Sequence, residues 1–224
     1  HVGSSPLSNE VVSAVGLLAF SGLYWLYSFS AKPFVWLQRL LLTMIVATGV
    51  AFVTMVSLAY SVDTIVTWSL PTVPISLWLN ALMGGPLLAA ITLYAAQWRA
   101  LAGRFGLLLM AAPFVALAAN MVVCIVQGRL LSGVTNSVVA AADLVPHYHV
   151  MLLVFALMCF AGCVLAAFTM HAVSREAVAH GGGELALSKR VLVRLLVSCL
   201  LVFAGVFIMR FAFYMMHLTV GLGV

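Results

Sequence analysis

The residues of this chain that could do chemistry lie at the ends of long apolar stretches. Glu10, in Ser8-Asn9-Glu10, stands directly before an apolar run that begins at Val11. One interpretation is the start of a helix, because small polar and acidic residues satisfy free backbone N–H groups there. The other is a carboxylate that accepts protons at the mouth of an apolar pocket. Residue types alone leave both interpretations open.

A second group of reactive side chains ends the last apolar stretch. Tyr214 follows Arg210 by four residues and His217 follows it by seven, so the three share one face if the helix continues past Tyr214. An arginine among apolar residues normally faces protein or water, or extends to the membrane surface. Arg210 could therefore neutralise a carboxylate, orient a ligand oxygen or reach the surface.

Amide side chains interrupt the middle apolar stretches. Asn80, Asn120 and Gln127 are candidates either for hydrogen bonds between helices or for ligand contacts. Gly84-Gly85-Pro86 breaks the pattern close to Asn80. This tripeptide predicts either a kink that shapes a cavity or close packing of a neighbouring helix.

Composition identifies the elements that must position these groups. The chain has 224 residues, of which 65% are hydrophobic and 7% charged, and its mean hydropathy is +1.22. Soluble domains carry roughly 25% charged residues. Apolar stretches of about 20 residues match helices that cross a bilayer, and no alternating strand pattern suggests a barrel.

We therefore predict an all-α fold, a polytopic transmembrane helical bundle in a single integral membrane domain, 1–224. The predicted spans are 10–30, 40–62, 75–96, 106–127, 150–171 and 191–216.

The distribution of charge predicts the orientation. Alternating spans place eight of the ten basic residues on one side: Lys32, Arg39, Arg99, Arg104, Arg175, Lys189, Arg190 and Arg194. Basic loops are retained in the cytoplasm, so both ends of the chain are expected outside. Glu10, Asn80, Asn120, Gln127 and Arg210 then share an outer depth. The net charge of +5 follows from these loops and does not indicate nucleic-acid binding.

Cysteine and histidine positions do not predict a resident metal or haem. The four cysteines lie in apolar runs without the spacing of an iron–sulfur centre, and we interpret them as packing residues: Cys124, Cys159, Cys163 and Cys199. His171 and His180 have no intramembrane histidine partner at equal depth. The sequence also lacks a phosphate-binding loop, a zinc signature and a nucleophile motif, so no catalytic residue is predicted.

Four stretches, in this order and at these spacings, resemble the membrane-anchor subunit of dimethyl sulfoxide reductase. They are Pro6-Leu7-Ser8-Asn9-Glu10; Ser61-Val62-Asp63-Thr64 leading to Met83-Gly84-Gly85-Pro86-Leu87-Leu88; Gln127-Gly128 leading to Asp143-Leu144-Val145-Pro146-His147-Tyr148; and Arg210-Phe211-Ala212-Phe213-Tyr214-Met215-Met216-His217-Leu218-Thr219-Val220-Gly221.

The resemblance implies an architecture and partners that composition does not show. Anchors of this family have eight spans, so this sequence is expected to hold the last six, with two spans and a quinol-site histidine upstream of residue 1. His1 does not match that histidine. Such anchors hold an iron–sulfur subunit and a molybdenum-cofactor subunit at the bacterial inner membrane. They oxidise menaquinol during anaerobic respiration, and Glu10 matches a family residue implicated in quinol binding.

Residue types and the resemblance together give two candidate sets. We expect quinol contacts from Glu10, Arg210, Tyr214, His217 and Asn80. We expect the docking rim for the iron–sulfur partner on the same outer side, with these members: Asp63, Trp68, Asp143, His147 and Tyr148.

Three alternatives stay open at this point. The protein could anchor a related polysulfide- or nitrite-type reductase, because the absent catalytic subunit selects the acceptor. It could be a secondary transporter, since broken helices occur in transporters, although its midplane carries few ionisable residues. It could also be a purely structural anchor that binds no quinol. Whether the chain is an enzyme stays open, since we expect a non-catalytic anchor that oxidises quinol as one subunit of an oxidoreductase complex.

Overall fold

The computed structural model describes residues 5–61, 64–136, 139–179 and 187–219, which form helices and no strand apart from two isolated bridges. The helices are α1 (Pro6–Tyr27), α2 (Val35–Ala59), α3 (Thr72–Ala95), α4 (Arg104–Leu131), α5 (Tyr148–Ala179) and α6 (Lys189–Met215), with the short 3₁₀ helices η1 (Arg99–Ala102) and η2 (Ala141–Leu144). All six α-helices are long and apolar enough to cross a membrane, which confirms the predicted fold class.

The first helix begins earlier than the sequence predicts. Its first residue is Pro6, whose fixed φ suits the first turn, and Ser5 occupies the N-cap position. No acidic residue lies in the first turn, so Glu10 belongs to the second. Ser8-Asn9-Glu10 therefore lies near the start of the helix, as one interpretation expected, but inside the helix and not at its cap. Glu10 lies beyond the first turn, where dipole stabilisation fades.

The fifth helix is longer than the predicted span 150–171. It runs to Ala179 because the sequence from His171 onward contains good helix formers and no proline or glycine. The hydropathy signal ends before the helix does, since this last part carries polar side chains that end the apolar pattern.

The chain divides into two compact units, His1–Asp63 and Thr64–Val224. The first unit is a hairpin of α1 and α2, closed where the Phe34 N–H donates to the Tyr27 hydroxyl at 2.6 Å. The two helices are in contact near Gly16, where a β-carbon would lie 3.4 Å from the Thr48 methyl group, an ordinary van der Waals distance. The single membrane domain stays a prediction.

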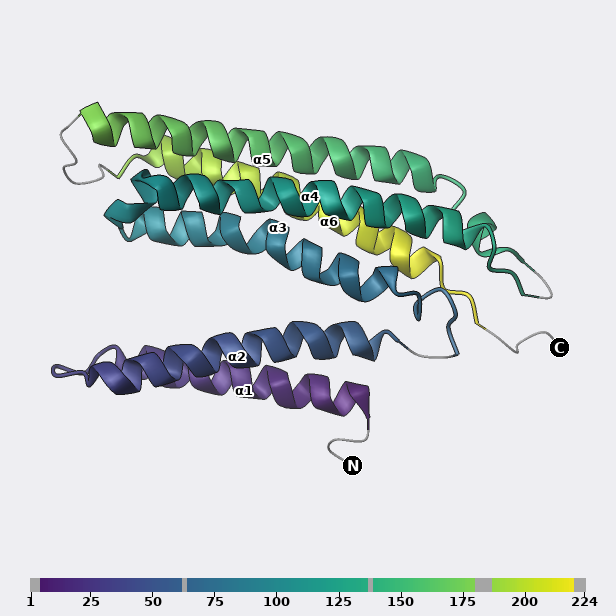
Figure 1. Cartoon of the computed structure of the whole chain (residues 1–224), viewed down its shortest axis with the longest axis horizontal. Coiled ribbons are helices and arrows are strands. Elements are labelled where there is room, and N and C mark those ends of the chain that lie inside the picture. Colours follow the sequence, from purple (N-terminus) through teal and green to yellow (C-terminus); the bar gives the residue numbers. More distant parts are fainter. Residues whose placement is uncertain (1–4, 62–63, 137–138, 180–186, 220–224) are drawn as a thin grey trace. The chain divides into compact units, whose positions relative to one another are not determined.

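The second unit is a four-helix bundle (Figure 1). Contacts between α3 and α4, α4 and α5, α5 and α6, and α6 and α3 close a ring of alternating direction. Its core contains fully buried Met83, Phe155 and Val202. Buried Tyr94 joins the end of α3 to the start of α6, because its hydroxyl accepts the Ser188 N–H at 3.0 Å.

The Gly84-Gly85-Pro86 tripeptide lies inside α3 and includes a close helix contact. The helix continues through Pro86 without interruption. Gly84 lies against α6, since a β-carbon there would come within 3.0 Å of the Phe203 ring. Of the two sequence-based interpretations of Gly84-Gly85-Pro86, close helix packing is the one that these contacts favour.

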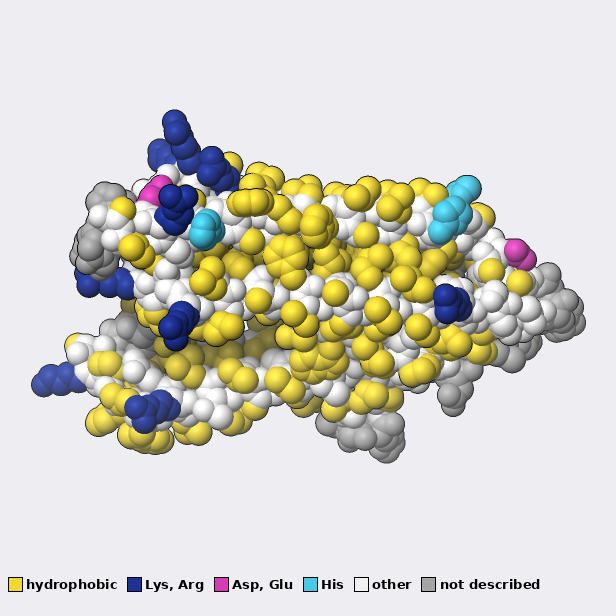
Figure 2. All heavy atoms as spheres, turned by 45° about the horizontal axis from the view of Figure 1, so that its top comes forward, with side chains coloured by type: hydrophobic (Ala, Val, Ile, Leu, Met, Phe, Trp, Pro, Cys, Tyr) yellow, Lys and Arg dark blue, Asp and Glu magenta, His cyan; other side chains and the backbone are white. Residues whose placement is uncertain are grey.

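The two ends of the bundle differ in charge. The basic end, where α3 and α5 finish and α4 and α6 begin, carries Arg99, Arg104, Arg175, Lys189, Arg190 and Arg194. We call the opposite end, where α6 finishes, the polar end. On the face drawn in Figure 2, hydrophobic side chains cover the length of the bundle between these ends, as expected for a lipid-facing surface.

Glycine also brings α5 and α6 together. A β-carbon on Gly162 would lie 2.7 Å from the Ser198 carbonyl oxygen, and one on Gly205 would lie 2.7 Å from the Cys159 sulfur. Cys159 is a free, fully buried thiol at this contact, in agreement with a packing role. Small residues at helix contacts are typical of membrane bundles.

Replacement of Gly162 by alanine should destabilise the bundle. The new β-carbon meets backbone of α6, so the expected loss is about 1–3 kcal/mol, the usual effect of overpacking. Thermal unfolding of the purified protein in detergent, followed by circular dichroism, measures this loss. Gly85→Ala is the matched control, because nothing lies within 4 Å of the added carbon. Equal melting temperatures of the two variants would contradict the close contact.

Candidate functional site

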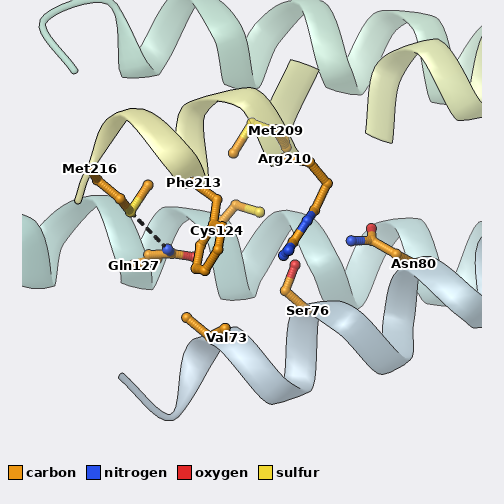
Figure 3. Close-up of a pocket in the computed structure, with 9 residues that line it drawn as sticks. All are labelled: Val73, Ser76, Asn80, Cys124, Gln127, Met209, Arg210, Phe213 and Met216. Carbon is orange, nitrogen blue, oxygen red and sulfur yellow. Dashed lines mark hydrogen bonds between the residues drawn. The ribbon is translucent and has the colours of Figure 1, made fainter. Parts of the chain in front are cut away.

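Near the polar end, α3, α4 and α6 enclose a small cavity among polar side chains (Figure 3). Its volume is about 20 Å³, and its lining residues are Val73, Ser76, Asn80, Cys124, Gln127, Met209, Arg210, Phe213 and Met216. We call Ser76, Asn80, Gln127 and Arg210 of this lining, together with buried Asn120, the polar layer. All members lie inside predicted spans, within the second unit.

The amides of the polar layer form hydrogen bonds between helices. Asn120 Nδ2 donates to Asn80 Oδ1 at 2.8 Å, which joins α4 to α3. Gln127 Nε2 donates to the Met216 sulfur at 3.2 Å, which joins α4 to the end of α6. The sequence left Asn80 and Asn120 open between helix contacts and ligand contacts. The structure shows that they pair with each other.

Arg210 brings a positive charge into this layer. The residue is half-buried on α6, and its side chain extends toward α3, where Figure 3 shows it beside Ser76 and Asn80. Its guanidinium carbon lies 4.3 Å from the centre of the Phe213 ring and 5.4 Å from that of Tyr214. Cation–π contacts of this kind stabilise a charge in an apolar region. The guanidinium therefore points into the bundle, so that simple extension to the surface does not describe it.

Trp68 gathers the aromatic side chains next to Arg210. Its ring stacks on Phe213 at 5.1 Å between centroids and meets Tyr214 edge-on at 5.9 Å. It also meets the His217 ring at 5.0 Å. The Trp68 indole N–H donates to the Phe213 carbonyl oxygen at 3.2 Å. We call these four residues the Trp68 cluster.

A buried threonine holds Trp68 in this position. Thr67 has no exposed surface, and its hydroxyl donates to the Met216 carbonyl oxygen at 2.5 Å. The Leu218 N–H donates to the same hydroxyl at 3.4 Å. An antiparallel bridge between Ile65 and Thr219 extends the contact. The segment before α3 is thereby fixed along the residues that follow α6.

The structure brings four of the five predicted quinol residues into one region. Asn80 and Arg210 belong to the polar layer, and Tyr214 and His217 to the adjoining Trp68 cluster. The helix ends at Met215, so His217 is held by Trp68 and not by helical periodicity. Tyr214 and His217 are exposed, whereas Asn80 and Arg210 are half-buried.

The fifth residue, Glu10, lies in the other unit. It is half-buried on α1, and the Ser13 hydroxyl donates to its backbone carbonyl oxygen at 2.8 Å. This hydrogen bond engages the backbone and not the carboxylate. A proton-accepting role for Glu10 stays a prediction.

The predicted docking residues occupy different environments. Asp143, in η2, and His147 are exposed at the polar end. Tyr148 is half-buried, and its hydroxyl donates to the Cys124 carbonyl oxygen at 2.8 Å. Trp68 belongs to the cluster described above. Asp63 lies outside the described residues.

A second, larger hollow lies between α4 and α5 at the polar end. Its volume is about 500 Å³, and its lining includes Arg129, Tyr148 and His149. Sequence reasoning did not single out Arg129 or His149, because both fall in a connection where polar residues are ordinary. No group of three or more histidine, cysteine, aspartate or glutamate side chains suited to a metal occurs among the described residues.

A double-mutant cycle should detect the pairing of Asn80 with Asn120. The single variants Asn80→Ala and Asn120→Ala are each expected to lower the melting temperature, while the double variant loses less than their sum. The expected coupling is about 0.6 kcal/mol, with an upper limit of about 1.7, as for other hydrogen bonds between membrane helices. Thermal unfolding in detergent gives the stability of the wild type, the two single variants and the double variant. A loss of stability in the double variant equal to the sum of the single losses would contradict the 2.8 Å contact between Asn120 and Asn80.

Comparisons with known proteins agree with this architecture. A family model described as DMSO reductase anchor subunit (DmsC) matches residues 1–216. One chain of the anaerobic dimethyl sulfoxide reductase of Escherichia coli is 35% identical over 225 aligned residues. A second anaerobic dimethyl sulfoxide reductase chain of the same organism, YnfH, is 31% identical over 230. Each alignment covers 100% of this chain and 72% of the relative.

A third relative extends the match beyond Escherichia coli. An anaerobic dimethyl sulfoxide reductase chain from Haemophilus influenzae is 28% identical over 152 residues, covering 67% of this chain and 53% of that protein. No solved structure matches the chain significantly. The match of the family model over nearly the whole sequence shows that this chain belongs to the family of dimethyl sulfoxide reductase membrane-anchor subunits.

Proposed function

We propose that this anchor binds and oxidises menaquinol and passes the electrons to an iron–sulfur subunit of a dimethyl sulfoxide reductase complex. Membership of the anchor family supports the assignment to such a complex. The single observation in the structure that supports quinol binding is Arg210, a cation directed into a polar layer of an otherwise apolar bundle. Ionisable side chains in such positions are usually functional.

The chemistry of quinol oxidation suits this set of groups. Oxidation of the quinol to the quinone releases two electrons and two protons. A guanidinium donates hydrogen bonds and favours the quinolate, so Arg210 would assist loss of the first proton. Arginine itself keeps its proton, so another group must accept the two released protons, one after the other, and pass each to solvent. His217, exposed beside Trp68, is our candidate, because imidazole is the side chain that most often serves as a general base and this one belongs to the Trp68 cluster.

The dimensions of the cavity restrict where the quinol ring binds. A volume of about 20 Å³ holds about one water molecule, whereas a cavity that accepts benzene measures about 150 Å³. We therefore place the ring against the exposed Tyr214 and His217 side chains of the Trp68 cluster. One quinol hydroxyl would point inward to Arg210. Aromatic side chains suit such a ligand, since they stack on its ring.

The electrons require an acceptor outside this protein. We propose that they pass to an iron–sulfur partner docked at the polar end, where Asp143 and His147 are exposed. That partner would deliver them to a molybdenum-cofactor subunit. By the predicted charge bias, the polar end faces the periplasm of a bacterial inner membrane. The Trp68 cluster lies at the same end, because three of its members surround the end of α6.

Removal of the Arg210 charge should impair quinol oxidation. We expect Arg210→Gln to lower quinol-driven turnover of the assembled complex by about tenfold to a hundredfold, the effect of one lost charge-assisted hydrogen bond. Turnover with an artificial electron donor that bypasses the quinol should be unchanged.

Arg129→Gln is the matched control for this experiment. Arg129 is an exposed arginine at the same end of the bundle, outside the polar layer. The control should keep both activities. Wild-type quinol turnover of Arg210→Gln would contradict the proposal and favour a purely structural anchor.

Glu10→Gln tests the proton acceptor that the resemblance suggests. The substitution keeps the shape and hydrogen bonding of the side chain and removes its ionisable group. If Glu10 accepts a proton, turnover should fall by about tenfold or more while the complex still assembles. Binding of a quinol analogue and turnover are measured in the same membranes, and normal values of both would exclude a role of Glu10 in quinol oxidation.

A further inference from the structure

A groove at the basic end of the bundle combines charge with apolar walls. It lies between the start of α4 and the end of α5 and has a volume of about 390 Å³. Its lining residues are Leu107, His171, Ser174, Arg175, Val178 and Ala179. The groove is separate from the polar layer, because α5 begins at the polar end and reaches these residues only near its C-terminus.

The polar residues of the groove continue a lipid-facing stripe of α5. Phe168, His171, Arg175 and Val178 follow one another at intervals of three or four residues, which places them on one helix face. Phe168 is 70% exposed. The stripe is thus apolar toward the middle of the helix and carries an imidazole and a guanidinium near its end, with the Ser174 hydroxyl beside them.

On the facing helix α4, a charged residue at the basic end is likewise followed by apolar residues toward the middle of the bundle. Arg104 begins α4 and is exposed, and Leu107, one turn later, lines the groove with 53% of its surface exposed. Farther along the same contact, the Phe114 and Phe160 rings meet edge-on at 6.2 Å between centroids. The contact between α4 and α5 is therefore polar at the basic end and apolar toward the middle of the bundle.

We propose that this groove binds the headgroup of an anionic phospholipid. Its phosphate would accept hydrogen bonds from the Arg175 guanidinium and the Ser174 hydroxyl, with His171 beside it. One acyl tail would follow the exposed apolar surface of Phe168 and Leu107. Basic pockets at the ends of membrane helices are suited to such lipids.

The arrangement of charge distinguishes this ligand from others. Glu176 is next to Arg175 in sequence but does not line the groove, so the lining contains a cation and no carboxylate. A free anion would gain nothing from the exposed apolar side chains, whereas a phospholipid uses both. A zwitterionic lipid would bring its own cation close to Arg175. An anionic diacyl lipid is therefore the occupant that fits the groove.

Native mass spectrometry of the purified protein tests the proposal. Protein in detergent is titrated with phosphatidylglycerol or phosphatidylcholine, and retained lipid is counted. Phosphatidylglycerol should bind selectively, and Arg175→Gln should weaken it by about fivefold, the factor for one cation near an anionic surface. Leu107→Trp should also weaken binding, because the larger side chain fills the groove without changing the charge.

Two controls make the result specific. Arg129→Gln removes an exposed arginine from the hollow at the polar end and should retain phosphatidylglycerol as the wild type does. Inorganic phosphate at equal concentration should leave the lipid bound. Equal retention of both lipids, full retention by Arg175→Gln, equal loss in Arg129→Gln, or displacement by phosphate would each overturn the proposal.

Discussion

In a bundle surrounded by hydrocarbon, each polar side chain needs a partner within the protein, and this constraint organises the polar end. Asn120 is almost fully buried and reaches Asn80, while buried Gln127 reaches the Met216 sulfur. These bonds join α4 to α3 and to the end of α6. An unsatisfied amide in such surroundings costs several kcal/mol, so the three elements are held in a fixed register. The Arg210 side chain lies in a layer whose geometry is fixed by these amide hydrogen bonds.

The same constraint explains why the segment before α3 contributes to the candidate site. Thr67, fully buried, has its hydroxyl bound to the backbone that follows α6. That bond places Trp68, near the start of the second unit, against Phe213, Tyr214 and His217, near its C-terminus. A polar layer with a small cavity thus adjoins an exposed aromatic surface. The combination suits a ligand with an aromatic ring and polar hydroxyls better than a wholly buried or a wholly exposed surface would.

Sequence reasoning predicted the number and approximate position of the helices, because apolar runs of this length have few other structures available. It also placed Asn80, Asn120, Gln127 and Arg210 at one depth, since helix direction alternates along the sequence. Two features depend on how each helix is rotated about its own axis: the pairing of Asn80 with Asn120 and the direction of the Arg210 side chain. The sequence does not predict this rotation, because the helices are apolar on all faces. The sequence predicts Trp68 only as a member of the docking rim for a partner, whereas the bonds of Thr67 and the stacking on Phe213 show that it packs on α6. Pro6 could have indicated the true start of α1, since proline favours the first helical turn.

Photoaffinity labelling of the assembled complex with an azidoquinone, followed by peptide mapping, tests the central claim most directly. If the quinol binds beside Arg210 and the Trp68 cluster, the label falls on Trp68 and on the segment 210–217, and an excess of menaquinol protects these peptides. Labelling confined to the hollow lined by Arg129 and His149 would contradict it, because the quinol would then bind away from Arg210 and the Trp68 cluster.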